Sequence, residues 1–212
     1  MRFLLCILAA LAFCHAAYAA DGAHPYKLTA ADKAALEHVE AYLTGIHTVS
    51  AEFIQSDPTG TISTGTFYLE RPGKLRMEYA PPMPVLMVAS GGYIVYYDKE
   101  LDQVSRILLD STLVGFLARE NIKFDNTVVV TDVVHSHDIL EISLVQAKHP
   151  TDGTLTLDFS ENPLALHTMI VKDSSGQITT VALNNARFNV SLDENLFVFK
   201  DPHLSGHRAI KN

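Results

Sequence analysis

The chain has 212 residues, 48% of them hydrophobic, and it carries 16 basic against 24 acidic side chains. This length and apolar content suffice for one domain with a sizeable core, which excludes a disordered or fibrous chain. A formal charge of −8, spread along the chain, disfavours a nucleic-acid partner, because phosphate binding needs a basic face. We therefore expect a globular protein that binds no nucleic acid.

The first residues have the order of a secretory signal peptide. Arg2 precedes an apolar run from Phe3 to Phe13, and small residues follow as far as Ala19. A basic start, an apolar centre and a small-residue cleavage site define such a signal, and the run is too short to span a bilayer. We expect residues 1–19 to be removed and the mature protein to be exported.

The rest of the chain, residues 20–212, is expected to form a single domain with its core in residues 28–202. We find no repeat and no low-complexity segment that would divide it. Both cysteines, Cys6 and Cys14, lie within the expected signal peptide. A disulfide or a thiolate site is therefore not expected in the mature protein.

The domain begins with a helical pattern and continues as strands. Thr29 and Asp32 have capping-box spacing, and apolar residues recur at helical spacing until Gly45. From Ser50 onward the hydrophobic period changes to two, with Gly, Pro, Asn and Asp at the turns. We expect strands at residues 50–56, 61–70, 74–79, 84–89, 92–98, 102–107, 127–134, 137–145, 153–159, 164–172, 177–183 and 196–200. Paired in sequence order, they give an antiparallel meander that curls into a barrel or half-barrel.

The strand pattern is interrupted between Asp110 and Asn121. Leu113, Phe116 and Leu117 indicate a short amphipathic helix inserted among the strands. Such an insertion can cover an opening in the barrel. The predicted fold is therefore mainly β with a helical lid (α+β): an incomplete antiparallel β-barrel covered by the N-terminal helix and the inserted helix.

A search for catalytic patterns is negative. The sequence has no Gly-x-Ser-x-Gly, no phosphate-binding glycine loop and no His-Glu-x-x-His. His135 and His137 could share a strand face and bind a metal with His149, but no fourth ligand follows the pattern, which favours a solvent-facing hairpin. We expect no catalytic residue, no cofactor and no metal site.

Two strands are apolar on both faces. Residues 84–89 and 93–97 carry apolar side chains in either register, so both of their faces need cover. We expect one cover from the barrel interior and one from the amphipathic helix. The interior can be an ordinary filled core or a lined cavity for an apolar ligand, and the pattern alone leaves both open.

Arg71 helps to separate these two interpretations. It ends the strand face that holds Phe67 and Leu69, so an inward orientation places its guanidinium at the rim of an apolar interior. There it must be hydrogen-bonded to carbonyls or a carboxylate, and it could fasten a lid. The alternative is an arginine that ends the strand in solvent.

The amino-acid sequence of one segment resembles that of a known family. Gly65 to Tyr79 reads Gly-Thr-Phe-Tyr-Leu-Glu-Arg-Pro-Gly-Lys-Leu-Arg-Met-Glu-Tyr, and it is similar to the corresponding run of the periplasmic outer-membrane lipoprotein carrier family, LolA. The segments from Tyr42 to Gln55 and from Tyr93 to Val104 agree with the same family. The resemblance covers roughly residues 36–107.

The resemblance implies a non-catalytic periplasmic carrier. In this family a hydrophobic cavity carries the acyl chains of lipoproteins from an inner-membrane ABC transporter to an outer-membrane acceptor. We expect a monomer in which Arg71 is the latch of the lid, and Leu113, Phe116 and Leu117 form the lid. The expected acyl-chain cavity is lined by Phe53, Phe67, Leu69, Leu75, Met77, Tyr79, Met87 and Tyr96.

Two features leave other readings open. The family commonly has Trp where Met77 and Tyr96 stand, and its lid usually begins with a proline that Ser111 to Gly115 lacks. The resemblance therefore does not fix the shape of the lid. The alternative function is a periplasmic sensor or adaptor whose half-barrel binds lipid or a protein segment without transporting it.

Overall fold

The structure, a computed structural model, describes residues 26–203. The expected signal peptide, residues 1–19, lies outside the described residues. The helices are α1 (Ala30–Thr44) and α2 (Leu113–Leu117), with 3-10 helices η1 (Leu109–Ser111) and η2 (Glu194–Phe197). The strands are β1 (Thr48–Ser56), β2 (Ile62–Glu70), β3 (Lys74–Tyr79), β4 (Val85–Ser90), β5 (Tyr93–Asp98), β6 (Gln103–Leu108), β7 (Val128–Ser136), β8 (Ile139–Gln146), β9 (Gly153–Glu161), β10 (Leu164–Asp173) and β11 (Ile178–Phe188).

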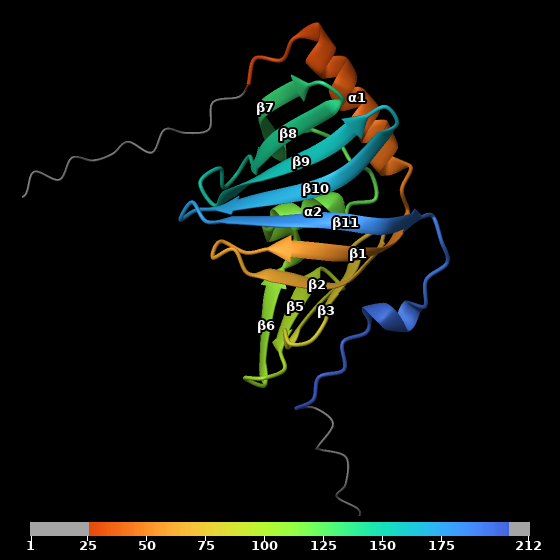
Figure 1. The fold of residues 1–212 in the computed structure, drawn as a ribbon, viewed down its shortest axis with the longest axis vertical. Helices are drawn as coiled ribbons and strands as arrows, with labels where there is room; N and C mark the ends of the chain where they lie inside the picture. Colours follow the sequence, from red (N-terminus) through yellow and green to blue (C-terminus); the bar gives the residue numbers. More distant parts are fainter. Residues whose placement is uncertain (1–25, 204–212) are drawn as a thin grey trace, which may run out of the picture.

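All eleven strands form one antiparallel sheet (Figure 1). Its order is β6-β5-β4-β3-β2-β1-β11-β10-β9-β8-β7, so the first and last strands of the chain meet in the middle. The edge strands, β6 and β7, do not pair with each other, and the sheet stays open. The predicted incomplete antiparallel barrel is confirmed. The connection between the two edges contains α2, which lies behind β10 and β11 in Figure 1.

The N-terminal helix forms where the capping pattern places it. The Thr29 side chain accepts a hydrogen bond from the Asp32 N–H at 3.2 Å, and the Asp32 carboxylate accepts one from the Thr29 N–H at 2.7 Å. These bonds satisfy donors that the first turn of a helix leaves free. Leu36, Val39 and Leu43 form the buried face of α1 and pack with the β7–β9 half of the sheet.

The core consists of two hydrophobic clusters, one in each half of the sheet. The first includes Phe53 and Met77 and lies mainly against β1–β5. The second includes Ile142 and Leu157 and lies between α1 and β7–β9. Met169 packs against both clusters, and this places the junction between them near β10.

The cover on the outward face of β3 to β5 differs from the prediction. Val88, on that face of β4, is only 1% exposed, and the segment that contains η2 contacts β3 and β4. Arg76 donates to the Leu196 carbonyl at 3.1 Å, and the rings of Tyr97 and Phe199 lie 5.7 Å apart. The expectation that the amphipathic helix covers these strands is therefore wrong, because the C-terminal segment covers them instead.

One strand prediction in the C-terminal segment is wrong. Residues 196–200 were expected to be extended, but residues 194–197 form η2. The Asp193 side chain accepts a hydrogen bond from the Asn195 N–H at 2.9 Å and so starts the turn. Phe197, 3% exposed, is buried by packing on the outside of the sheet and not by strand pairing.

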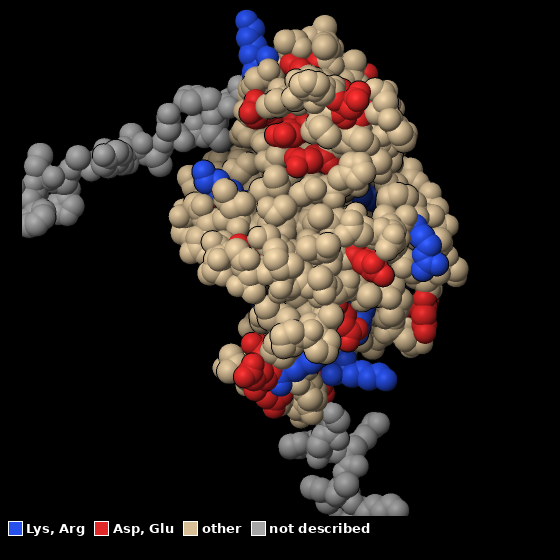
Figure 2. Space-filling model, in the orientation of Figure 1, with Lys and Arg blue, Asp and Glu red and all other residues tan. Residues whose placement is uncertain are grey.

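Charges are unevenly distributed over the face shown in Figure 2. Acidic side chains gather over β7 to β9, and both signs occur together near the β5–β6 turn and the C-terminal segment, whereas the surface over β10 and β11 is nearly uncharged. The basic side chains on this face mostly stand apart. Within residues 26–203, neither helix has the length and apolar content needed to cross a bilayer.

Candidate ligand cavity and its arginine

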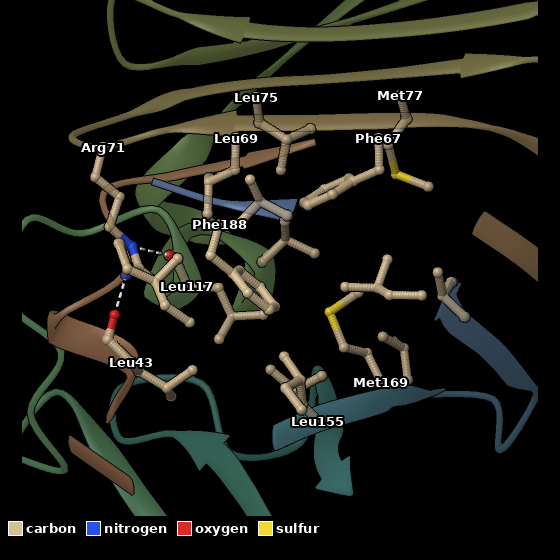
Figure 3. Close-up of a pocket in the computed structure, with 17 residues that line it drawn as sticks. Leu43, Phe67, Leu69, Arg71, Leu75, Met77, Leu117, Leu155, Met169 and Phe188 are labelled. Carbon is tan, nitrogen blue, oxygen red and sulfur yellow. Dashed lines mark hydrogen bonds between the residues drawn. The ribbon is translucent and has the colours of Figure 1, made fainter. Parts of the chain in front are cut away.

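An apolar cavity of about 90 Å³ lies between the two halves of the sheet (Figure 3). Seventeen residues line it, and all of them are apolar except Arg71. Figure 3 shows β2 and β3 side chains on one side of the cavity, and Leu155 and Met169 on the other. Away from Arg71, a space of this composition has no polar partner for a water molecule, so it suits an apolar ligand.

Four of the expected cavity residues line this space. They are Phe67, Leu69, Leu75 and Met77. β2 and β3 are antiparallel, with Phe67 opposite Met77 and Leu69 opposite Leu75, so all four point to the same face. The strict alternation of β2 and β3 in the sequence reflects this one buried face.

The other four expected residues pack nearby without lining the cavity. Phe53 and Tyr79 meet edge to face, with ring centroids 5.0 Å apart. A side chain at Gly65 would lie 2.7 Å from the Phe53 ring, so a glycine is needed there. Burial raises the pKa of the Tyr79 hydroxyl, which donates to the Gln55 side chain at 2.7 Å. Met87 and Tyr96 are half-buried against the same cluster.

The sequence interpretation missed the lining from the second half of the sheet. β9, β10 and β11 contribute six of these residues: Leu155, Leu166, Met169, Val171, Val181 and Leu183. The end of α1 and the start of β1 add Leu43, Ile46 and Val49, and the half-exposed Phe188 closes the end near them. Alternation in β11 could have indicated Val181 and Leu183, but the resemblance did not reach these strands.

Arg71 lies at one end of the cavity and joins three segments of the chain. Its Nε donates to the Leu117 carbonyl at 2.8 Å, and its Nη1 donates to the carbonyls of Leu43 and Ile46 (Figure 3). Leu43 and Leu117 belong to the last turns of α1 and α2, whose carbonyls have no partner within the helix. Burial lowers the pKa of Arg71 to about 10, which leaves the guanidinium charged at neutral pH.

The turn after Arg71 makes main-chain bonds to the same segments. The Arg71 N–H donates to the His47 carbonyl at 2.9 Å, and the Gly73 N–H donates to the Ala118 carbonyl at 2.8 Å. Gly73 has a φ of 75°, a left-handed conformation that favours glycine. The Arg-Pro-Gly sequence therefore places both a side chain and a backbone donor at the end of α2.

The residues of α2 face two sides. Val114 and Leu117 line the cavity, whereas Leu113 and Phe116, also expected in the lid, line a separate cleft outside it. Gly115 lies so close to η1 that a Cβ there would be 2.2 Å from the Leu109 carbonyl oxygen. The short helix is thus packed tightly on η1 and separates the cavity from the cleft.

The histidines do not come together. His135 lies 3.1 Å from the Glu161 carboxylate and 3.4 Å from the Asp32 carboxylate, and the His137 ring lies beside Ser136. His149 instead lines the cleft beside α2. Across residues 26–203, no group of three or more His, Cys, Asp or Glu side chains is placed to hold a metal ion.

Comparison with known proteins identifies the family. The family model described as outer membrane lipoprotein carrier protein LolA matches residues 44–200. The chain belongs to the LolA family. The match includes the Arg-Pro-Gly turn, α2 and all eleven strands, so every residue that lines the cavity except Leu43 lies within it.

Relatives matched over more than three quarters of their length include two carrier proteins of this family. The LolA-family chain is 29% identical over 172 residues to an outer-membrane lipoprotein carrier protein of Methylococcus capsulatus, with 77% of this chain and 82% of the relative covered. It is 28% identical to a protein of the same name from Halorhodospira halophila, covering 82% and 86%. It is also 25% identical to a Rickettsia prowazekii protein described as uncharacterised, covering 80% and 78%.

Proposed function

We propose that this LolA-family protein is a periplasmic carrier that holds the acyl chains of lipoproteins in the cavity and moves them from the inner to the outer membrane. The observation that carries the proposal is a cavity whose lining is apolar except for Arg71, which bonds to both helices at its rim. The names of its relatives support the cargo class. A monomeric protein without catalytic or cofactor chemistry suffices for this role.

The size of the cavity indicates a closed form. Its volume is about 90 Å³, whereas pockets for ligands of ordinary size have about 300 to 1,000 Å³. An acyl chain therefore requires that the lining separate. The segment best placed to move is α2, a five-residue helix whose Val114 and Leu117 form part of the lining.

Arg71 is proposed to be the latch of this movement. In the closed form its three hydrogen bonds join β2, α1, the α1–β1 connection and α2. Burial of the guanidinium carries a desolvation cost, seen in its lowered pKa, and this cost offsets part of the gain from the bonds. A closed form held in this way is stable without cargo and still opens.

Free-energy magnitudes indicate why partners are needed. Moving an acyl chain from water into the cavity gains about 0.8 kcal/mol per methylene, or roughly 13 kcal/mol for about sixteen carbons, so loss of the chain to water is negligible. Transfer from a bilayer gains almost nothing, because both surroundings are apolar. We propose that an inner-membrane ABC transporter loads the carrier and an outer-membrane acceptor unloads it.

A ligand analysis tests the proposed function. Protein purified from the periplasm without detergent is extracted and examined by mass spectrometry, and the stripped protein is titrated with a fluorescent fatty acid. We expect lipidated protein in the extract and displacement of the probe by a diacyl lipopeptide. A protein that binds neither the probe nor the lipopeptide contradicts a carrier role, and a bound unlipidated peptide favours the sensor or adaptor alternative.

A further inference from the structure

Two further spaces lie between the cavity and the surface. A middle hollow of about 190 Å³ shares Val114 and Val171 with the lining of the cavity. An outer cleft of about 860 Å³ shares Leu113, Gln146 and His149 with the middle hollow. Because each space shares wall residues with the next, the three adjoin one another in order from the apolar interior to the surface.

The outer cleft lies where the sheet fails to close. Leu108 at the end of β6 and Val128 at the start of β7 are both in its wall, and these are the two unpaired edge strands. Leu113 and Phe116 of α2 form the wall nearest the lid. One short helix therefore separates the cavity from the outer cleft, and the middle hollow passes beside it.

The polarity of the wall changes along this series. The cavity has one charged lining residue, whereas the outer cleft has side chains of both signs. Arg119 and Asp125 lie 3.8 Å apart in this wall. Asp110 and Lys148 are exposed there, and neither side chain has a hydrogen bond or ion pair with the rest of the described chain. Gln146 adds an amide that both donates and accepts.

We infer that the outer cleft binds the stretch of polypeptide next to the acylated residue of a lipoprotein, while the acyl chains pass the middle hollow into the cavity. The inference rests on the proposed carrier function. An acylated polypeptide is apolar at its acyl end, and its backbone offers hydrogen-bond donors and acceptors at the other end. The three spaces change from apolar to polar in the same order, from the cavity to the outer cleft. Asp110, Asp125, Arg119 and Lys148 give the cleft two charges of each sign, so it neither repels nor selects the phosphate of a phospholipid, and a phospholipid is therefore the competing ligand in the test.

A substitution that narrows the outer cleft tests this site apart from the cavity. Asn126 is exposed in the turn before β7 and lines the outer cleft but neither the middle hollow nor the cavity, so Asn126→Trp places a large side chain in the cleft alone. Ile139→Trp is the matched control, since Ile139 is 40% exposed at the opposite end of the β7–β8 pair and lines none of the three spaces. Three ligands are titrated: a fluorescent fatty acid, a short peptide with an N-terminal diacylglyceryl cysteine, and a dioleoyl phospholipid.

We expect Asn126→Trp to weaken binding of the lipopeptide about tenfold. The fatty acid and the phospholipid should bind as they do to the Ile139→Trp control. Equal weakening of all three ligands, or of none, overturns the inference while leaving the carrier function intact. If the unaltered protein binds no acylated ligand, the proposed function fails, and the inference fails with it.

A crosslinking experiment identifies the group in the cleft directly. Both natural cysteines lie in the expected signal peptide, so Asn126→Cys in the mature chain can be labelled at a single site with a benzophenone. Irradiation with the lipopeptide bound should give a crosslink to the peptide part, identified by mass spectrometry. Ile139→Cys should give none. A crosslink to the acyl chain, or equal yields at both positions, overturns the assignment.

Discussion

The Nε of Arg71 lies 2.8 Å from the carbonyl oxygen of Leu117, so the end of β2 is bonded to the end of α2 across the rim of the cavity. The same guanidinium bonds to the Leu43 carbonyl at the end of α1. Opening the cavity on the α2 side requires that the first of these bonds break. The residues that hold the closed form and those that pack the lid can therefore be tested separately.

Gly115→Ala should destabilise the lid. The added Cβ would lie 2.2 Å from the Leu109 carbonyl oxygen, so α2 has to move away from η1. We expect a loss of about 1 to 3 kcal/mol in the free energy of unfolding, as for other overpacked sites, measured by denaturant titration. Gly45→Ala is the control, because its Cβ would meet the nearest atom at 3.4 Å with a φ of −70°. Equal losses in both variants would contradict the tight packing of α2.

Val181→Phe should reduce acyl-chain binding without unfolding the protein. Val181 lines the cavity, so the larger ring has free space to occupy and removes that space from a ligand. We expect fluorescent fatty acid to bind about tenfold more weakly, equivalent to about 1.4 kcal/mol. Val133→Phe, in the packed cluster beside α1, should instead cost about 1 to 3 kcal/mol of stability. Unchanged fatty acid affinity in Val181→Phe would place the ligand elsewhere.

The docking of α1 should weaken in acid. Hydrogen bonds from Thr29, with a smaller contribution from His135, lower the pKa of Asp32 in the folded protein. A lowered folded-state pKa stabilises the fold above the ordinary Asp value of about 3.9, and this contribution is lost as the pH falls through the folded-state pKa.

Asp32→Asn should therefore flatten the acid limb of a plot of unfolding free energy against pH. Glu37→Gln is the control, because Glu37 is exposed on α1 and has no hydrogen bond to another described residue. The contribution of Asp32 is disproved if the two variants and the unaltered protein lose stability in parallel.

Phe197→Ala should destabilise the protein while leaving the cavity intact. Phe197 is 3% exposed on the outward side of the sheet, and the Lys74 ammonium lies 5.8 Å from its ring centroid. Removal of a buried Phe costs about 3 to 5 kcal/mol, which calorimetry should show as a lower melting temperature. Val198→Ala, at a residue 53% exposed, should have little effect. Weaker fatty acid binding by folded Phe197→Ala would link this segment to the cavity.

The sequence was sufficient to predict the first half of the site. β2 and β3 alternate without interruption because one face of each is buried, so Phe67, Leu69, Leu75 and Met77 could be placed on the same face from parity. The same parity put Tyr79 on the inward face, and Phe53 was expected in the cavity from the resemblance, but neither could show that these two rings pack on each other.

The part of the cavity lining that comes from β9, β10 and β11 depends on features that the alternation of side chains along a strand does not show. A register shift between Leu166 and Thr168 reverses the inward positions of β10, because one extra residue turns the following side chains to the other face. The pairing of β1 with β11 joins strands at opposite ends of the chain, whereas hairpin reasoning pairs strands in sequence order. The sequence alone could therefore not predict that Met169 and Leu183 line the same cavity as Phe67.

Residues 196–200 show why an apolar run alone does not define a strand. Phe197 is buried and Val198 is exposed, which mimics strand alternation, yet the segment packs on top of the sheet and pairs with no strand. This segment packs against the outward face of β4, and the contact accounts for the apolar pattern both of the segment and of β4. The sequence indicated the need for a cover there but not which segment supplies it.

The most direct measurement compares the cargo held and released by Arg71→Leu and by the unaltered protein. Without the hydrogen bonds to the carbonyls of Leu43, Ile46 and Leu117, the closed, empty form is less stable, so the equilibrium shifts toward the loaded form. Bound lipopeptide per chain is measured after purification without detergent, followed by its rate of transfer to acceptor-containing outer-membrane vesicles, with Arg71→Lys as a partial replacement. We expect Arg71→Leu to fold normally, retain more cargo and release it more slowly. Equal occupancy and equal transfer rates in the two proteins would contradict a cavity closed by Arg71.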